Sequence, residues 1–378
     1  MKKIFCFSIF LFLMTLVFSA DEAAAVKLCI ESSTKAGMTF NFNEMAQYCS
    51  SDYVKIDNQN KVVTRVILER SARFFQRLSD PGLTFEELIT LNAENQGRTL
   101  SDADRDKAKK VDQSGDGKRI VQQTRAHLQR QIEMLKKNIP VILKNTVYSE
   151  PVFYKNYAVI FYQGNFGVAY KGVVLLRKEK GSWKIYREMM LEMTGSQDTA
   201  SEQEVRDFVM EYTRRTADFS KYPALLESSC AKTALSVMHD GAVVTYSQTE
   251  KLGRFLSLLI AGTPPLAEVM PLLIEGRGGT VTPEMLKNYQ KMDLTGQGRE
   301  HVLKLRQEVQ RQQAKTQHCV KEFRIEHIFF YQDLALVLEH SSLPSAGPIE
   351  GVTLIRKEAG KYLYHKSVSR KRPALELP

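Results

Sequence analysis

The sequence has few of the residues and motifs that would assign it a chemistry. Its 378 residues include 5 cysteines and 7 histidines, with no CxxC pair and no two histidines four positions apart, as on a metal-binding helix. It also has no GxSxG nucleophile motif, no glycine-rich phosphate loop and no HExxH. These absences argue against metal, acyl-transfer and nucleotide chemistry. We therefore predict no catalytic, cofactor-binding or metal-binding residue.

Proline and long apolar runs are also scarce. Only 12 residues are proline and 25% are charged, a composition typical of a globular protein and not of disorder, collagen or a disulfide-dense miniature scaffold. One stretch alone is apolar enough to approach a membrane span, and it lies at the N-terminus. At roughly 150 residues per domain, the length predicts two domains or one large one.

The N-terminal stretch has the layout of a secretory signal peptide. Lys2 and Lys3 precede an apolar run from Ile4 to Phe18, and small residues follow it. The run is short for a transmembrane helix, and the leading positive charges are typical of an export signal. We predict that residues 1–20 are cleaved and that the protein is periplasmic or secreted. The alternative is a retained N-terminal anchor helix.

The chain contains an internal duplication. Residues 172–184 align without a gap on residues 351–363, with 7 identities in 13 positions and a shift of 179 residues. Residues 99–117 align on residues 280–298 at a shift of 181 residues. Offsets this constant predict two copies of one domain. The predicted domains are residues 21–194 and 195–378.

The cysteines of the exported chain would stand in an oxidising compartment. Four cysteines allow three pairings, and the sequence does not choose among them. One disulfide within each half, Cys29–Cys49 and Cys230–Cys319, is the simplest pairing. Four buried free thiols are the alternative, because the cysteine spacings differ between the halves.

The order of periodicities is the same in both halves. Helices are expected over about 22–37, 41–50 and 64–79, and over about 201–217, 219–229 and 245–261. A small hairpin is expected before the third helix of each half, and a helical insertion after it, at about 82–138 and 263–318. Strands are expected near 141–149, 152–163, 167–178 and 183–191 in the first half. The second half repeats them near 321–330, 333–340, 350–358 and 361–368.

Helices followed by an antiparallel meander describe an α+β domain whose helices pack on one face of the sheet. A strongly curved sheet closed by helices forms a cone with an apolar pocket. The predicted fold class is therefore α+β, with two tandem cone domains. Each has N-terminal helices packed on a curved antiparallel sheet, plus a helical insertion.

This order of elements resembles the nuclear-transport-factor-like superfamily, also known through SnoaL-like and steroid-isomerase-like domains, and the resemblance implies two tandem cystatin-like/SnoaL-like cone domains. The resemblance rests on the opening helix Glu22–Lys35 and on the closing strands NYAVIFYQGNF and GVVLLRKEKGSWKIY, with Tyr362 standing in the second copy where Trp183 stands in the first. Paired domains of this superfamily bury sheet faces against each other, which implies an intrachain pseudo-dimer. The two insertions depart from the compact family pattern.

Members of the superfamily with isomerase activity place a carboxylate base and Tyr or protonated Asp donors around an apolar pocket. No base–donor set in this sequence matches the family positions, so the resemblance carries over no catalytic residue. Glu150 is the one acid near the strand tyrosines. These tyrosines are Tyr148, Tyr154, Tyr157, Tyr162 and Tyr170.

Residues 112–123 partly match a calcium-binding EF-hand loop. Asp112, Ser114 and Asp116 occupy the first three ligand positions, and Gly117 occupies the turn position. The twelfth position holds Gln in place of the bidentate Glu, and two basic residues lie where the cation would bind. We favour a helix-breaking turn in which Asp116 caps the next helix.

Positive charge is concentrated in the first insertion. The net charge is +10, and residues 105–144 alone carry 11 basic against 4 acidic side chains. This segment is either a solvated helix face or a docking surface for an anionic envelope partner such as lipid, polysaccharide or an acidic protein. Nucleic acid is not an expected partner outside the cytoplasm. The residues of this basic surface are Lys107, Lys109, Lys110, Lys118, Arg119, Arg125, Arg130, Lys136 and Lys137.

Taken together, these features predict an exported, non-catalytic ligand-binding or protein-interaction module of the bacterial envelope, without a cofactor. Its partner would be a small apolar ligand or an envelope protein. The alternatives are an enzyme with a steroid-isomerase-like pocket in one half, and a structural factor that docks anionic partners through the basic surface. The pockets separate these classes: tyrosines with a buried carboxylate favour an enzyme, a dry apolar cavity favours a lipophile binder, and a filled core favours a scaffold.

Overall fold

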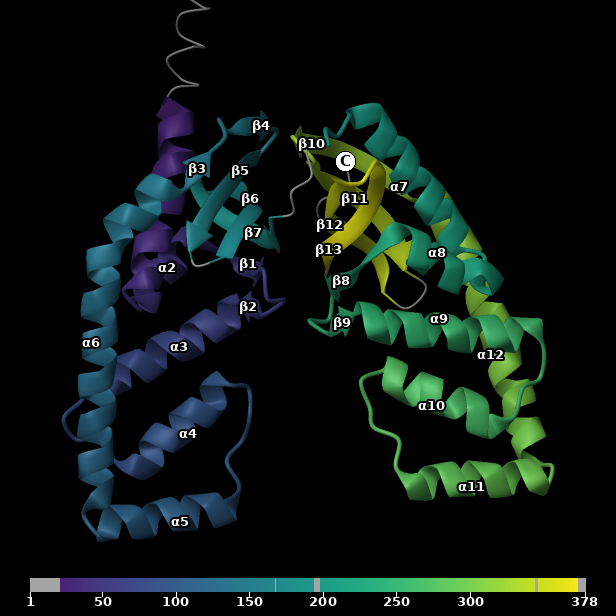
Figure 1. Ribbon diagram of the computed structural model, residues 1–378, viewed down its shortest axis with the longest axis horizontal. Helices are drawn as coiled ribbons and strands as arrows, with labels where there is room; N and C mark the ends of the chain where they lie inside the picture. Colours follow the sequence, from purple (N-terminus) through teal and green to yellow (C-terminus); the bar gives the residue numbers. More distant parts are fainter. Residues whose placement is uncertain (1–20, 167, 194–197, 344–345, 373–378) are drawn as a thin grey trace, which may run out of the picture. The chain divides into compact units, whose positions relative to one another are not determined.

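The computed structural model describes residues 21–166, 168–193, 198–343 and 346–372 (Figure 1). The chain divides into two compact units, the first ending at Met193 and the second beginning with the next residue. The signal peptide predicted for residues 1–20 lies outside the described residues. Within the described ranges, no helix combines the length and the apolar character that a bilayer crossing requires.

The first unit follows the predicted order of elements (Figure 1). It opens with a helix over 21–38, then α2 (Phe42–Tyr48), the hairpin strands β1 (Cys49–Ile56) and β2 (Val62–Thr64), and α3 (Arg65–Leu78). The insertion is α4 (Phe85–Asn95), α5 (Asp102–Gln113) and the long α6 (Asp116–Asn145). The closing strands are β3 (Val147–Tyr148), β4 (Val152–Tyr154), β5 (Tyr157–Phe166), β6 (Val168–Glu179) and β7 (Ser182–Glu192).

The second unit repeats this order. It opens with α7 (Glu202–Thr216), the 3-10 helix η1 (Phe219–Lys221), α8 (Tyr222–Ser229), the strands β8 (Cys230–Val237) and β9 (Val243–Thr245), and α9 (Tyr246–Ala261). Its insertion is α10 (Leu266–Gly276), α11 (Pro283–Leu294) and α12 (Gln297–Lys321). Its closing strands are β10 (Arg324–Tyr331), β11 (Leu334–Leu343), β12 (Gly347–Glu358) and β13 (Lys361–Lys371). The predicted class, two tandem α+β cone domains with helical insertions, is confirmed.

The two sheets share one topology. Their strand orders are β2-β1-β7-β6-β5-β3, with β4 also paired to β5, and β10-β11-β12-β13-β8-β9. All neighbouring strands run antiparallel except β1 with β7 and β8 with β13, which are parallel. A parallel pair needs a long connection between its strands, and here the third helix, the insertion and the meander provide it. The predicted antiparallel sheet is therefore wrong for this one pair in each unit.

Two predicted strands of the first unit also differ from the structure. The strand expected near 141–149 is mostly the end of α6, which continues through Pro140 because Ile139 and Ile142 share a buried helical face. The strand expected near 152–163 is a hairpin, with its turn at Lys155, whose φ is 52°. An apolar run alone does not distinguish a buried helical turn from a strand.

The repeated Arg-Lys-Glu sequence of the closing strands holds the opening helix of each unit in place. Lys178 and the indole Nε1 of Trp183 both donate hydrogen bonds to Glu22, at the start of the first helix. In the second unit Lys357 and the hydroxyl of Tyr362 donate to Glu204, at 2.9 and 2.7 Å. The substitution of Trp by Tyr between the copies thus preserves a donor to the same kind of carboxylate.

In each insertion an aspartate binds the start of a neighbouring helix. The carboxylate of Asp112 accepts the first two backbone N–H groups of α4 at 2.9 and 3.0 Å, and Asp293 does the same for α10 at 2.8 and 2.9 Å. These N–H groups have no partner within their own helix, and the positive end of the helix dipole favours the negative charge. A Cβ on Gly117 would lie 2.1 Å from the Asp112 carboxylate, which explains the repeated glycine.

The partial EF-hand match therefore has a structural explanation. The two carboxylate oxygens of Asp112 accept backbone N–H groups, which stabilise the negative charge of the carboxylate. This carboxylate is therefore poorly suited to bind a calcium ion. Gly115, with φ at 84°, is the N-cap of α6, so the expectation that Asp116 caps this helix is wrong. Asp116 is instead the first helical residue and pairs with Arg119 at 3.1 Å.

We expect Asp112→Ala and Asp293→Ala each to lower the free energy of unfolding by about 1–2 kcal/mol, the typical cost of losing a helix cap. Urea unfolding followed by circular dichroism measures the change. Asp106→Ala is the matched control, because Asp106 is exposed on α5 and binds no helix terminus. Equal stabilities of Asp112→Ala and Asp106→Ala would contradict this role.

Candidate functional site

The second unit contains a cavity of about 510 Å³ between its helices and the inner face of its sheet. Helices α7, α8 and α9 form one side, strands β8, β11, β12 and β13 form the other, and α12 contributes Thr316 from the insertion. The walls are mostly aliphatic and aromatic. The cavity is large enough for a small organic molecule.

Glu339 on β11 is the one acid among the described residues that line this cavity. It pairs with Gly351 on β12, and a Cβ at that glycine would lie 2.6 Å from the Glu339 Oε1. The hydroxyl of Thr353 donates a hydrogen bond to Oε1 at 3.3 Å. Part of the side chain is accessible because it faces the cavity, yet protein atoms surround it. Burial raises the pKa of Glu339 to about 7, against the opposing effect of the Thr353 hydrogen bond.

Tyrosines surround the rest of the cavity. The rings of Tyr212 on α7 and Tyr364 on β13 have centroids 4.2 Å apart, and the Tyr212 hydroxyl lies 3.6 Å from the sulfur of Cys230. Burial, and next the negative charge of Glu339, raise the pKa of Tyr364 well above its usual value. These hydroxyls remain protonated at neutral pH and can act as hydrogen-bond donors. The site thus combines a mostly apolar volume with one carboxyl, several tyrosine hydroxyls and the side chains of His365 and Lys366.

The first unit has a smaller cavity of about 210 Å³ at the corresponding place. Its wall carries an ion pair between Lys55 Nζ on β1 and Glu188 Oε1 on β7, at 2.7 Å. Glu188 also accepts hydrogen bonds from the hydroxyls of Tyr162, at 3.1 Å, and Tyr53, at 3.5 Å. Burial by itself would lower the pKa of Lys55, but the adjacent Glu188 carboxylate outweighs it and the pKa is raised. The charge of the Glu188 carboxylate is therefore already balanced by Lys55, and its oxygens already accept hydrogen bonds from the protein.

The tyrosines singled out from the sequence separate into two groups. Tyr148, Tyr162 and Tyr170 line the first cavity, whereas Tyr154 and Tyr157 are not among its lining residues. Glu150 lies away from the cavity and pairs with Lys27 at 2.9 Å, with 82% of its side chain exposed.

Sequence reasoning missed both cavity acids, Glu188 and Glu339. The available signal for Glu339 was Gly351, which lies beside it on the neighbouring strand, whereas the repeat of this glycine, Gly172, lies beside Tyr162 and does not mark Glu188. A glycine inside a strand indicates a close approach of this kind.

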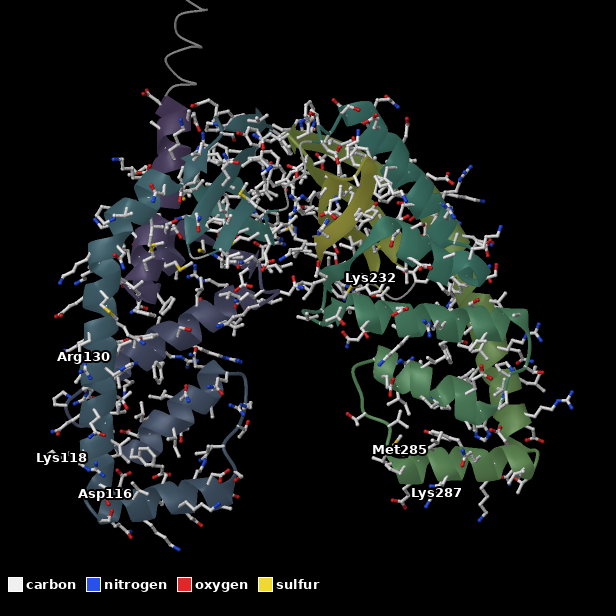
Figure 2. The ribbon with its side chains drawn as sticks, viewed as in Figure 1. Asp116, Lys118, Arg130, Lys232, Met285 and Lys287 are labelled. Carbon is white, nitrogen blue, oxygen red and sulfur yellow. The ribbon has the colours of Figure 1, made fainter. Side chains whose placement is uncertain are left out.

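The residues of the basic surface lie on α5 and α6, and eight of the nine are exposed. The exception is Arg125, which is half-buried and donates to the backbone carbonyls of Leu78 and Asp80 at the end of α3. Figure 2 shows Lys118 and Arg130 on the side of α6 that faces away from α4. Within the described part of the chain, six of these residues form no ion pair with an acidic side chain: Lys110, Lys118, Arg125, Arg130, Lys136 and Lys137. Docking of an anionic partner stays a prediction.

Four of the five cysteines lie in the described residues, and all four are free thiols in the structure. Cys29 and Cys49 lie in the same core cluster, where burial raises their pKa values to about 11 and about 12. Cys230 lines the second cavity, and burial raises its pKa to about 11. Cys319 is half-exposed on α12. The disulfide pairing stays a prediction.

Among the described residues, no group of three or more His, Cys, Asp or Glu side chains is arranged to hold a metal ion. His365 has its pKa lowered to about 4, first by burial and then by the neighbouring charges of Arg356 and Lys366. It is therefore neutral at pH 7.

No family model matches the chain, and no curated protein matches it. Four solved chains are similar to this one, and three of them are described here. A ketosteroid isomerase-like protein from Erwinia carotovora atroseptica is 12% identical over 46% of this chain and 97% of its own, with a TM-score of 0.22. An NTF2-like protein of unknown function from Shewanella baltica is 8% identical over 47% and 97%, with a TM-score of 0.23. A domain with a cystatin-like fold from Nostoc punctiforme is 11% identical over 49% and 82%, with a TM-score of 0.23.

These structures carry the names of the superfamily that the sequence resembles, and each covers about half of this chain. The chain's own elements form one α+β arrangement, present twice. At such identities and TM-scores the likeness concerns the fold alone, so the function has to be argued from the cavities.

We expect Glu339→Gln to stabilise the protein against the wild type as pH rises. The folded-state pKa of Glu339 is about 7, above its ordinary value of 4.5, so ionisation opposes folding and stability is lost between these pH values. Between pH 5 and pH 8 the difference in unfolding free energy between variant and wild type should shift by about 2 kcal/mol in favour of the variant. Urea unfolding at both pH values measures it.

The comparison between variant and wild type removes the contribution of other groups. His365 has a lowered pKa and loses stability as pH falls, the opposite direction, but both proteins contain it. Glu284→Gln, at an exposed position of α11, is the matched control and should show no shift. A Glu339→Gln difference that is constant with pH would show that this carboxyl is not in an apolar environment.

Proposed function

We propose that the protein is an exported ligand-binding module and that the cavity of its second unit holds a small, mostly apolar molecule. The observation that carries this proposal is the cavity of about 510 Å³ with Glu339 as its acid. A core completely packed with side chains would favour a scaffold, but the core of the second unit contains this cavity. Export is supported by the sequence of residues 1–20 alone.

The chemistry of the wall limits the ligand. At pH 7 a large share of Glu339 is protonated, so it can donate a hydrogen bond as well as accept one. A ligand carboxylate placed directly beside Glu339 would meet the negative charge of its ionised form, and like charges at short range are costly. The ligand atom that meets Glu339 is therefore expected to be a neutral oxygen or nitrogen. Aromatic and aliphatic side chains would cover the rest of the ligand.

We expect the neutral apolar fluorophore N-phenyl-1-naphthylamine to bind the wild-type protein saturably, with one site per chain. Ala234→Phe puts a large ring into the cavity wall and should weaken binding at least about tenfold, equivalent to about 1.4 kcal/mol. The readout is the fluorescence increase on titration. Ala314→Phe, at an exposed position of α12 in the same unit, should bind as the wild type does. Equal affinities of the two variants would refute binding in this cavity.

Proton transfer is a second candidate function, and the pKa of Glu339 favours it. A carboxyl with a pKa of about 7 can take up and release a proton at neutral pH, the condition for efficient general acid–base catalysis. The hydroxyls of Tyr212 and Tyr364 lie in the same cavity and could stabilise an enolate oxygen. In such a reaction Glu339 would remove a proton α to a ketone and return it to the γ carbon.

If this second function holds, the protein will convert 3-cyclohexen-1-one into its conjugated isomer, followed as the rise in ultraviolet absorbance of the enone. Glu339→Gln should reduce the rate about 100-fold or more, because the variant lacks the base. Glu284→Gln should leave the rate unchanged. A wild-type rate equal to that of buffer leaves binding alone as the proposed function.

A further inference from the structure

The duplication allows the two cavities to be compared residue by residue. β1 pairs with β7 in the same register in which β8 pairs with β13, so Lys55 lies opposite Glu188 where Ser236 lies opposite Ser367. Both pairs line their cavities. The ion pair in the first unit spans 2.7 Å, and the two serine hydroxyls in the second are 2.8 Å apart. One strand junction thus carries two long charged side chains in one unit and two short neutral ones in the other.

A second position differs in the same direction. Tyr162 lies beside Gly172 as Glu339 lies beside Gly351. The Tyr162 ring extends over its glycine, where a Cβ would lie 2.4 Å away, and its hydroxyl reaches Glu188 at 3.1 Å. The shorter Glu339 leaves this part of the second cavity open. The two cavity volumes, about 210 Å³ and about 510 Å³, follow the sizes of these side chains.

The charged side chains that line the first cavity also already have partners within the protein. Glu188 accepts from Lys55, Tyr162 and Tyr53, and an entering molecule would have to separate an ion pair that is largely out of water. Removing one partner of such a pair leaves a charge that is costly to bury. Glu339, in contrast, accepts a single hydrogen bond within the described residues, from Thr353, and faces open volume.

We propose that the Lys55–Glu188 ion pair, with Tyr162, narrows the cavity of the first unit and keeps ligand out of it, and that Ser236 and Ser367 at the same positions leave the second cavity open to ligand. These residues determine which copy of the duplicated domain binds ligand. The first unit then has a structural role, while the second retains a site for one ligand per chain. This inference rests on the proposed binding function and adds the residues that restrict it to one unit.

The test uses the full chain and N-phenyl-1-naphthylamine. Lys55→Ser/Glu188→Ser removes both charges at once, so no unpaired charge stays buried, and it gives the first unit the serine pair of the second. We expect this variant to bind two molecules per chain instead of one. In the Ala234→Phe background it should restore binding in a protein that has lost it. Arg254→Ser/Glu250→Ser, which removes an exposed ion pair of α9, is the matched control and should keep one site.

The reverse exchange, Ser236→Lys/Ser367→Glu, should abolish binding in the second unit, and it keeps the inference testable if the first variant does not fold. Circular dichroism and urea unfolding establish that each variant is folded. A folded Lys55→Ser/Glu188→Ser protein with one site, or a folded reverse variant with wild-type affinity, would overturn the inference. Absence of binding by the wild type, or binding that Ala234→Phe does not weaken, would instead overturn the proposed function.

Discussion

The parallel pairing of β1 with β7, and of β8 with β13, is the constraint on which the rest of each unit depends. It joins the strand that follows the opening helices to the last strand of the unit, across the third helix, the insertion and the meander. The register is identical in both copies, including an irregularity at Tyr186 and at His365. A bulge at this place increases the local twist of the sheet, which helps the helices to close it. Residues of this parallel strand pair line the cavity of each unit.

Because the junction is the same in both units, the character of each cavity depends on a few side chains. The first unit places the Lys55–Glu188 ion pair there, and the second places Ser236 and Ser367, with Glu339 as the acid of its cavity. A carboxyl that the protein neutralises with a lysine behaves as part of the core. A carboxyl in an apolar cavity with one hydrogen bond has its pKa raised and can interact with a ligand. The duplication thus gives one scaffold with two different cavity linings.

Much of the fold could be predicted from the sequence. The internal repeat set the two domains, and periodicity placed α3, α9 and the long strands within a few residues. Prediction was wrong where local signals were ambiguous: a strand was expected near 141–149, but α6 continues to Asn145 with Ile139 and Ile142 on its buried face. The Asp112 loop matched a calcium motif in residue type. The partner of Asp112, the start of α4, is 26 or 27 residues away in the chain and has no signature in the loop itself.

The sequence by itself determined the duplication, the α+β order of elements, the resemblance to a superfamily of cone-shaped domains and the charge of the first insertion. These are properties of local pattern and of comparison between segments of one chain. Only the tertiary structure decided which acids face a cavity and whether they are paired there. Lys55 and Glu188 are 133 residues apart and meet solely because β1 and β7 are neighbours in the sheet. The environment of Glu339, and hence its pKa, likewise depends on helices and strands that are distant in sequence from β11 and meet it only in the folded unit.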